Sequence, residues 1–310
     1  MDSHIVVVGS LNMDLVVSTP RIPQPGETII GSAFKTVPGG KGANQAVAAA
    51  RLGAWISMVG KVGDDGFGRQ LRHNLETAGV RHDFVTQSPA VASGVALITV
   101  EESGQNSIVV ALGANTQLSP ADIDAADELI AGAGIMLLQL ECPLDSVIHA
   151  TARARRHGVN VILNPAPAQP LPAELLQMVD ILIPNETEAE LLTGISVHTD
   201  DDAANAARAL LALGVGAVII TLGDRGALLA CGGEITHFPP FPVVAVDTTA
   251  AGDAFIGGLA VALSEGKMLP DAVRLGSAAG ALAATRAGAQ SSLPTRSDVE
   301  AMLRAAETPR

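Results

Sequence analysis

The sequence predicts an α/β protein, a three-layer domain built on a parallel sheet, with a small antiparallel β-sheet that forms a lid. Short β-branched runs alternate along the chain with Ala- and Leu-rich stretches of helical length. Strands that are apolar throughout and separated by helices are typical of parallel sheets covered on both faces. Two further segments contain strand-like runs with no helix between them, and these predict the lid. The 310 residues, 48% of them hydrophobic, suffice for one large core with a small appended element.

The elements of the main domain follow one another as strand and helix, beginning with an N-terminal strand. The predicted strands are the apolar runs Ile5 to Val8, Ile56 to Val59, Ile135 to Leu140, Val159 to Leu163, Ile181 to Pro184 and Ala217 to Thr221. The predicted helices are Ala43 to Leu52, Gly68 to Ala78, Leu144 to Arg156, Ala203 to Leu213, Ala254 to Leu263 and Asp271 to Thr285. This alternation is that of βαβ units, which place neighbouring strands in parallel.

The lid is predicted from Met13 to Val37 and from Ala92 to Leu112, the second with a turn at Glu101 to Asn106. Strands joined by short turns form antiparallel hairpins. We therefore expect one single-chain unit, with the lid at about 12–37 and 92–112 and the main domain at about 1–11, 38–91 and 113–310. Because an uncovered sheet edge invites association, the lid also favours a homodimer.

Composition restricts the partners and the compartment. The net charge is −13 and the basic residues are scattered, so the chain has no footprint for nucleic acid or for an anionic membrane. No apolar run approaches ~18 residues, and the N-terminal segment lacks the basic region of a signal peptide. Cys142 and Cys231 lie far apart, outside any zinc or disulfide motif. We expect a cytoplasmic protein that binds small molecules.

The strongest functional motif runs from Ala245 to Gly258, where Asp247 and Asp253 flank small residues at the start of a predicted helix. Unpaired N–H groups and small side chains at a helix N-terminus favour a bound anion. Because a carboxylate there would repel a phosphate, the expected role of Asp253 is to accept a proton from an attacking hydroxyl. The motif therefore indicates phosphoryl transfer. The alternative is that Asp253 is only a favourable acid in a first helical turn and Gly252 only part of a turn.

A glycine-rich turn from Pro38 to Gly53 enters a helix of small residues. The turn lacks the GxxxxGK[ST] spacing and the preceding buried strand of a Walker A motif, which excludes a P-loop. Exposed amides beside Lys41 and Asn44 suit the hydroxyls of a small polar ligand. The alternative is that the glycines serve helix packing and that Lys41 is solvated.

Polar residues follow two of the predicted strands. Asn12 and Asp14 come after the first strand, and Glu141 comes directly after the strand that ends at Leu140. Ligands of open α/β sheets collect at the carboxyl ends of strands. These residues are therefore candidates for holding hydroxyl groups, although an Asn and Asp pair after a strand is also an ordinary turn.

Two later strands are followed by further candidates. Asn185 and Glu188 have the spacing of a capping box, and equally that of two oxygen ligands near Mg²⁺. Thr221 to Gly226 would turn backbone amides toward a ligand at the sheet edge, and is otherwise an ordinary hairpin turn. The seven histidines show no metal-ligand spacing, and no GxSxG elbow is present, which removes support for hydrolases and metalloenzymes.

Together these motifs resemble the ribokinase-like sugar kinases, also called the phosphofructokinase B-type family. The resemblance covers essentially the whole chain in collinear order. It rests on the segments Gly9-Ser-Leu-Asn-Met-Asp14, Gly39-Gly-Lys-Gly-Ala-Asn44, Asn164-Pro-Ala-Pro167, Asn185-Glu-Thr-Glu188, Thr221-Leu-Gly223 and Asp247-Thr-Thr-Ala-Ala-Gly-Asp253. It implies the fold expected above, with the lid at a dimer interface.

The resemblance also implies a role for each motif. Asp253 would be the catalytic base, beside an anion hole made by the backbone amides of Ala250, Ala251, Gly252 and Asp253. The residues implied to bind the sugar are Asn12, Met13, Asp14, Gly40, Lys41, Gly42, Ala43, Asn44, Glu141 and Asp253. Those implied to meet ATP are Asn185, Thr221, Leu222, Gly223, Asp224, Arg225, Gly226, Gly252, Asp253 and Ser277.

Two metal cofactors are implied in the same way. Glu188 would organise Mg²⁺ through water. A monovalent cation, K⁺, would lie beside the anion hole, bound mostly through backbone carbonyls, on Asp247, Thr249, Ala283, Arg286, Gly288 and Ser292. Ser277 is a departure, because these kinases often place a histidine there, near the adenine, and this leaves the base preference open.

The expected reaction is the ATP-dependent phosphorylation of D-ribose at O5 to D-ribose 5-phosphate. The intact motif from Gly39 to Asn44, together with Glu141, favours a free pentose. The nearest alternative is a kinase of the same family that acts on 2-deoxyribose, another sugar or a nucleoside. A more distant alternative is a non-catalytic sugar-binding protein on this fold, against which the retained Asp253 argues.

Overall fold

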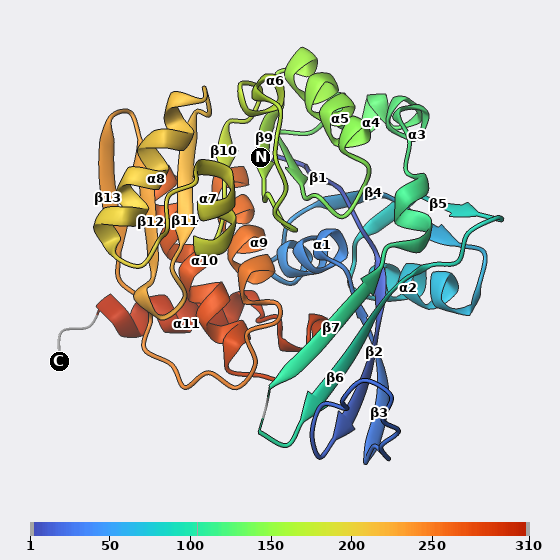
Figure 1. Cartoon of the computed structure of the whole chain (residues 1–310). Helices are drawn as coiled ribbons and strands as arrows, with labels where there is room; N and C mark the ends of the chain where they lie inside the picture. The colour runs from blue at the N-terminus through green and yellow to red at the C-terminus, as the bar shows by residue number, and fades with distance from the viewer. Residues whose placement is uncertain (1–2, 104, 308–310) are drawn as a thin grey trace.

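The computed structural model describes residues 3–103 and 105–307 and has the α/β architecture that the sequence predicts. Residue 104, in the turn predicted at Glu101 to Asn106, lies outside the described residues, as do the outermost residues of the predicted main domain, 1–2 and 308–310. A layered body carries a separate ribbon of four strands that projects from one side (Figure 1). The predicted fold class is confirmed.

A nine-stranded sheet forms the middle layer of the body, in the order β13-β12-β11-β10-β9-β8-β1-β4-β5. Its strands are β1 (Ile5–Val8), β4 (Ile56–Gly63), β5 (Arg81–Ser88), β8 (Ile135–Leu138), β9 (Asn160–Leu163), β10 (Ile181–Leu182), β11 (Ala217–Thr221), β12 (Ala227–Cys231) and β13 (Glu234–Phe238). The strands from β5 to β11 pair in parallel, as predicted. β12 and β13 add an antiparallel edge, and neither strand is among the predicted ones.

Helices cover both faces of this sheet. Consecutive side chains of a strand point to opposite faces, so each buried strand contributes side chains to an apolar core on either side. Ile5 and Val7 of β1 belong to one apolar core, whereas Val6 and Val8 belong to the other. The first core is closed by α1 (Lys41–Arg51), α2 (Gly66–Thr77), α9 (Ala251–Ser264), α10 (Leu269–Ala284) and α11 (Arg296–Glu307). The second is closed by α3 (Pro120–Ala125), α4 (Asp127–Ala131), α5 (Leu144–His157), α6 (Ala173–Leu176), α7 (Glu186–Thr193) and α8 (Asp200–Ala212).

The projecting sheet is the predicted lid, and its strand order is β3-β2-β6-β7. It consists of β2 (Asn12–Thr19), β3 (Ala33–Gly39), β6 (Gly94–Glu101) and β7 (Asn106–Ala111). The two hairpins are antiparallel, but their central strands β2 and β6 pair in parallel, so the sheet is mixed rather than purely antiparallel. The reason is topological: β2 and β6 both leave the body outward, and β3 and β7 both return to it.

The described part of the chain also contains three short 3₁₀ helices, at Gly113–Gln117, Gly223–Arg225 and Gln290–Ser292. The second lies in the turn from Thr221 to Gly226, which connects β11 to β12 and is thus a hairpin turn as well as a candidate site. Among the helices that the structure describes, none is both long enough and apolar enough to cross a membrane.

Candidate active site

Asp253 lies in the first turn of α9 and is buried, with 6% of its surface exposed. The side-chain amide of Asn44 donates to Asp253 Oδ2 over 2.9 Å, and that of Gln45 donates to Oδ1 over 3.0 Å. Burial raises the pKa of the Asp253 carboxyl to about 6, against the opposing effects of Lys41 and the two amides and with a small addition from Glu141. A carboxyl that titrates near neutral pH is suited to accept a proton.

The start of α9 is open toward the same site. Ala250 is the N-cap residue and forms no side-chain cap, while the Ala251 N–H bonds to the Thr248 carbonyl over 3.1 Å. The N–H groups of Gly252 and Asp253 belong to the first turn, where a helix provides no internal acceptors. A Cβ atom at Gly252 would meet only open space, so this glycine leaves the helix end accessible. Together with the helix dipole, these groups can hold an anion.

The glycine-rich turn before α1 brings that helix against the end of β1. Gly40 is the N-cap of α1 with φ of 91°, and a Cβ atom there would lie 2.6 Å from the Asn12 backbone nitrogen. A Cβ atom at Gly42 would lie 2.7 Å from the Ser10 nitrogen. Both positions therefore require glycine for steric reasons, which supports the packing interpretation of this motif. The close approach also places the Asn44 amide against Asp253, so the turn serves packing and shapes the site as well. Its role in sugar binding stays a prediction, and Lys41 is partly buried rather than fully solvated.

Glu141, three residues after the end of β8, is the centre of the predicted sugar-binding cluster. Its carboxylate accepts hydrogen bonds from the Ser10 hydroxyl (2.5 Å), from the Asn12 amide (3.3 Å) and from the Lys41 backbone N–H (3.1 Å). The Asn115 amide in turn donates to Asn12 Oδ1 over 2.8 Å. Residues from four distant segments are thus held in one buried network.

Asp14 faces this network from β2 of the lid. Burial, together with Glu141 and Asp253, raises the pKa of the Asp14 carboxyl to about 7. A buried carboxyl next to two others is costly to ionise. Asn44 adds an unsatisfied acceptor, because its buried Oδ1 has no hydrogen-bond partner among the described residues. Hydroxyl groups of a ligand would satisfy such atoms.

Lys41 lies among the carboxylates of Asp253, Glu141 and Glu188. Burial alone would lower the pKa of its ammonium group, but these three carboxylates outweigh it and raise the pKa above its usual value. Lys41 is therefore charged, and it concentrates positive charge in an acidic protein at the place where a phosphate could bind.

A cavity of about 640 Å³ extends from Asp253 and Lys41 along the sheet edge. Its walls come from segments that are distant in sequence: Asn164, Ala166, Ile183, Asn185–Glu188, Thr221, Gly223, Asp224, Gly226, Pro240–Val243, Thr248, Thr249, Ala251–Asp253, Ser277, Gly280 and Ala281. The volume is in the range of nucleotide and cofactor sites. Ser277 is one wall residue, and its buried hydroxyl has no partner among the residues described.

Asn185 and Glu188 form a complete capping box at the start of α7. The Asn185 side chain accepts from the Glu188 N–H over 2.8 Å, and Glu188 accepts from the Asn185 N–H over 2.9 Å. The capping interpretation is confirmed, and both residues nevertheless line the cavity. Burial raises the pKa of the Glu188 carboxyl, opposed by the Asn185 N–H and by Lys41.

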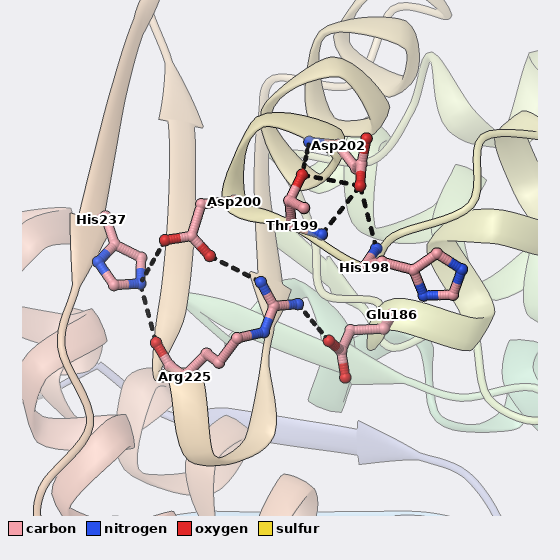
Figure 2. Close-up of polar contacts among 7 residues, drawn as sticks. All are labelled: Glu186, His198, Thr199, Asp200, Asp202, Arg225 and His237. Carbon is pink, nitrogen blue, oxygen red and sulfur yellow. Dashed lines mark hydrogen bonds and ion pairs between the residues drawn. The ribbon is translucent and has the colours of Figure 1, made fainter.

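The turn after β11 divides into two parts. Thr221, Gly223, Asp224 and Gly226 line the cavity. Leu222 is buried in the second apolar core instead, with 1% of its surface exposed. Arg225 is outside the cavity lining: its guanidinium pairs with Glu186 at 2.5 Å and Asp200 at 2.7 Å, as Figure 2 shows.

Asp247 accepts hydrogen bonds from the Thr249 N–H (3.0 Å) and the Gly288 N–H (2.8 Å), so part of the predicted cation site is assembled. Burial opposes it, but these donors and the Thr249 hydroxyl hold the pKa of Asp247 below its usual value. The other predicted members make contacts of their own. The Ala283 carbonyl accepts from the Arg286 N–H, the Arg286 side chain pairs with Asp298 at 3.4 Å, and the Ser292 hydroxyl donates to the Ala289 carbonyl.

Several polar residues of this site are absent from the predicted set, among them Ser10, Gln45, Asn115 and Gln139 of the buried hydrogen-bond networks. Ser10 and Gln45 lie inside or next to the quoted motifs, so their position in those motifs is a usable signal. Asn115 lies outside these motifs, shortly after the predicted lid. Gln139 is less visible, because it lies within the run Ile135 to Leu140, which looks apolar throughout at first sight. A buried polar residue at a strand end is the signal that was available.

Comparison with known proteins agrees with this geometry. The family model described as "pfkB family carbohydrate kinase" matches residues 2–296. The ribokinase of Haemophilus influenzae is 44% identical over 298 residues, which cover 96% of this chain and 97% of that protein. The deoxyribokinase of Salmonella typhi is 43% identical, over 94% and 95% of the two chains. The structure of Arabidopsis thaliana ribokinase complexed with ribose and ATP superposes with a TM-score of 0.92 at 37% identity, covering 98% of this chain and 99% of that one. The chain belongs to the pfkB family of carbohydrate kinases.

Proposed function

We propose that this protein transfers the γ-phosphoryl group of ATP to O5 of D-ribose, giving ADP and D-ribose 5-phosphate. One observation carries the proposal: Asp253, a buried carboxyl with a pKa of about 6, lies at the open N-terminus of α9 in a cavity that also contains Lys41. A sugar-binding protein without catalysis would have no use for a base beside an anion site. The full-length similarity to ribokinases supports the same conclusion.

In the proposed reaction, ribose lies between Asp14, Glu141 and Asn44, and ATP lies along the cavity. The ribose O5 hydroxyl attacks the γ-phosphorus in line, so that an O5–P bond forms while the bond from phosphorus to the β,γ-bridging oxygen breaks. The O5 proton passes to the Asp253 carboxylate, and ADP leaves with the bridging oxygen. The amides of Gly252 and Asp253 donate hydrogen bonds to the oxygens on which charge develops.

The Glu188 region fits Mg²⁺ in the outer-sphere manner proposed for it. Mg²⁺ keeps several waters and binds proteins through one or two carboxylates plus substrate phosphates. Glu188 offers one buried carboxylate on the cavity wall, and Asn185 fixes its orientation through three hydrogen bonds. Bound there with ATP, the ion would neutralise phosphate charge during transfer.

The loop around Asp247 fits a monovalent cation such as K⁺, which we propose as an activator. Asp247 joins this loop to Gly288, and Thr249 lies only a short distance before the anion hole. Carboxylate, hydroxyl and carbonyl oxygens are the ligands that hard cations prefer. A bound ion would stiffen the loop without contacting the sugar.

2-Deoxyribose is the second candidate substrate, because a deoxyribokinase is nearly as similar to this chain as the ribokinases are. We favour ribose because its C2 hydroxyl, which 2-deoxyribose lacks, would engage more of the oxygens and amides around Asp14, Glu141 and Asn44. We also propose a cytoplasmic location, in keeping with two free cysteines, Cys142 and Cys231.

The experiment is an ADP-release assay of the purified full chain with ribose, 2-deoxyribose, fructose and adenosine, each with and without K⁺. We expect the highest kcat/KM with ribose, stimulation by K⁺, and a 5-phosphate product in the phosphorus NMR spectrum. Phosphorylation of 2-deoxyribose in preference to ribose would select the second candidate. Binding of ribose without phosphorylation of any of the four compounds would establish a binding protein instead.

The Asp253→Asn variant tests the role of the base in the same assay. Loss of a positioned general base typically lowers the rate by ~10²–10⁴, while ribose affinity measured by calorimetry should be largely retained. Asp122→Asn is a matched control, since Asp122 is a partly buried acid that pairs with Lys61 away from the cavity. Near-normal turnover of Asp253→Asn would exclude Asp253 as the base.

A further inference from the structure

A chain of buried amide side chains lies behind Asp253. Gln45 of α1 has no exposed surface, and its Nε2 donates both to Asp253 Oδ1 (3.0 Å) and to Asn164 Oδ1 (3.4 Å). Its Oε1 accepts a hydrogen bond from Gln139 Nε2 over 2.6 Å. Gln139 follows β8 and is 1% exposed. Both ends of the Gln45 amide are therefore engaged.

These partners leave the Gln45 amide one orientation. If its oxygen and nitrogen exchanged places, the oxygen would face the Asp253 carboxylate and the NH₂ group would face the NH₂ group of Gln139. Both contacts would be repulsive and would leave buried groups unsatisfied. Gln139 thus satisfies the Gln45 oxygen only in the orientation that turns the Gln45 NH₂ group toward Asp253, while the buried Oε1 of Gln139 itself has no partner among the described residues.

Two glycines make room for this arrangement. A Cβ atom at Gly9 would lie 2.1 Å from Gln139 Oε1, so only glycine lets the Gln139 amide occupy its place. A Cβ atom at Gly257 would lie 2.6 Å from the Ala48 Cβ, and its absence lets α1 pack close to α9. The backbone after β1 and the packing of α1 against α9 thus leave space for the Gln45 and Gln139 amides, although neither residue lines the cavity.

We propose that Gln45 and Gln139 are positioning residues for the catalytic base: Gln139 orients Gln45, and Gln45 holds Oδ1 of Asp253, leaving Oδ2 to meet the substrate hydroxyl beside Asn44. The inference rests on the proposed function, because it takes Asp253 as the base. Neither glutamine touches the substrate. A carboxylate held by a donor on each oxygen keeps one geometry through proton transfer, which positioned catalysis requires.

The pH dependence of activity is the readout that a merely structural role would not change. The charged groups that face Asp253 are Lys41 of α1 and Glu141 after β8, and Asp14 of the lid is coupled to it. A donor to the ionised form lowers a carboxyl pKa, so its removal raises the pKa. In Gln45→Leu we expect the acid limb of kcat/KM to move up by about one pH unit, which corresponds to a roughly threefold loss at pH 6.5 and to a loss of about tenfold well below pH 6.

Gln45→Glu is the isosteric second variant, useful if Gln45→Leu does not fold. It places a second carboxyl against Asp253, and we expect its acid limb to move further in the same direction. Gln139→Leu should produce a smaller shift. If Gln139 acts through Gln45, the double variant with leucine at both positions shifts no more than Gln45→Leu alone.

A direct titration separates this inference from the proposed function. In protein labelled with ¹³C at aspartate carboxyls, the Asp253 resonance is the one lost in Asp253→Asn, and its midpoint should rise in Gln45→Leu whether or not ribose is the substrate. Thr151→Val, which removes a buried hydroxyl within α5 on the opposite face of the sheet, should lower stability without moving that midpoint. An unchanged midpoint and an unchanged acid limb in folded Gln45 variants would overturn the inference, and additive shifts would remove Gln139 from it.

Discussion

At the scale of single residues, the site contains buried carboxyls whose ionisation lowers the stability of the fold, and a helix N-terminus that is open to a phosphate group. Asp14 is such a carboxyl. Its pKa is about 7 in the folded protein and 3.8 in a model compound, with burial as the largest cause. The folded state therefore binds the proton more tightly, and stability falls as the pH rises from about 4 to about 7.

Asp14→Asn should consequently stabilise the protein at pH 8, on the order of 2–4 kcal/mol, because it removes the cost of an ionised buried group. The gain should shrink as the pH falls and vanish below about pH 3.8, where Asp14 becomes protonated in both states. Urea unfolding at pH 5 and at pH 8 measures the difference, with Asp83→Asn as the control, since the Asp83 side chain is 67% exposed. Equal stability of Asp14→Asn and the parent at pH 8 would contradict the assignment. Ribose affinity should fall in the same variant.

Gly252 keeps the N-terminus of α9 open to a phosphate group, because a methyl group there would meet no protein atom within 4 Å. Gly252→Ala should leave the free protein as stable as before or more stable by roughly 0.5–1 kcal/mol, since alanine loses less entropy in a helix. The methyl would nevertheless stand where a phosphate approaches, and a misplaced reactant can cost up to ~10² in rate. Thermal unfolding and kcat/KM for ATP measure the two effects. Gly66→Ala in the first turn of α2 is the control, because a Cβ atom there also meets only open space. Normal kinetics in Gly252→Ala would exclude phosphate approach at this point.

At the scale of elements, Arg225 connects three of them. Its ion pairs join the turn after β11 to Glu186 at the start of α7 and to Asp200 at the start of α8, while its carbonyl accepts from His237 of β13 (Figure 2). These side chains are 30–53% exposed, so the pairs contribute little to global stability, about 0–1 kcal/mol. What they fix is the position of the cavity wall relative to α7.

Arg225→Ala should therefore raise the KM for ATP severalfold, about the effect of 1 kcal/mol, and leave the KM for ribose and the melting temperature nearly unchanged. Steady-state kinetics with each substrate varied in turn separate these quantities. Arg274→Ala is the matched control, because Arg274 forms a distant ion pair with Glu307 at 3.9 Å. A variant that loses ribose and ATP affinity equally would show that Arg225 acts on the whole fold.

The strands differ in how well they could be predicted from the sequence. β11 is predicted residue for residue and β1 likewise, because a buried parallel strand is a continuous apolar run. β5 is concealed because four polar or charged residues stand among its first six, Arg81 to Thr86, as befits an exposed edge. The hydrogen bond from Gln45 to Asp253 joins residues 208 positions apart, and the one from Gln139 to Gln45 joins residues 94 positions apart, which no local pattern encodes. The motif around Asp253 is enough to predict a catalytic base there, whereas only the tertiary structure shows which side chains hold its carboxylate.

At the scale of the whole molecule, the lid exposes apolar side chains on the face turned away from the site. Residues opposite one another in register share a face of a sheet, and successive residues alternate. Asp14 pairs with Ala96, and Ala96 with Val110, so this row faces the sugar cluster. The adjacent row, with Leu97 opposite Val109, must face the other way, and these side chains are 52% and 63% exposed. All six residues of β7 are exposed, so no segment among the described residues covers either face of this edge strand.

A second copy of the chain is the expected cover, and Val109→Glu should convert a dimer into monomers. A charge buried at an apolar interface costs several kcal/mol, which is enough to dissociate a weakly associated dimer. Sedimentation equilibrium of the parent and the variant measures the change. Ile108→Glu is the control: it lies next in the same strand but on the opposite face, so it should leave the dimer intact. A monomeric parent, or equal dissociation by both substitutions, would refute pairing through this face. Since Asp14 extends from the same sheet into the site, dissociation should also weaken ribose binding, because the partner no longer holds the lid in place over the sugar.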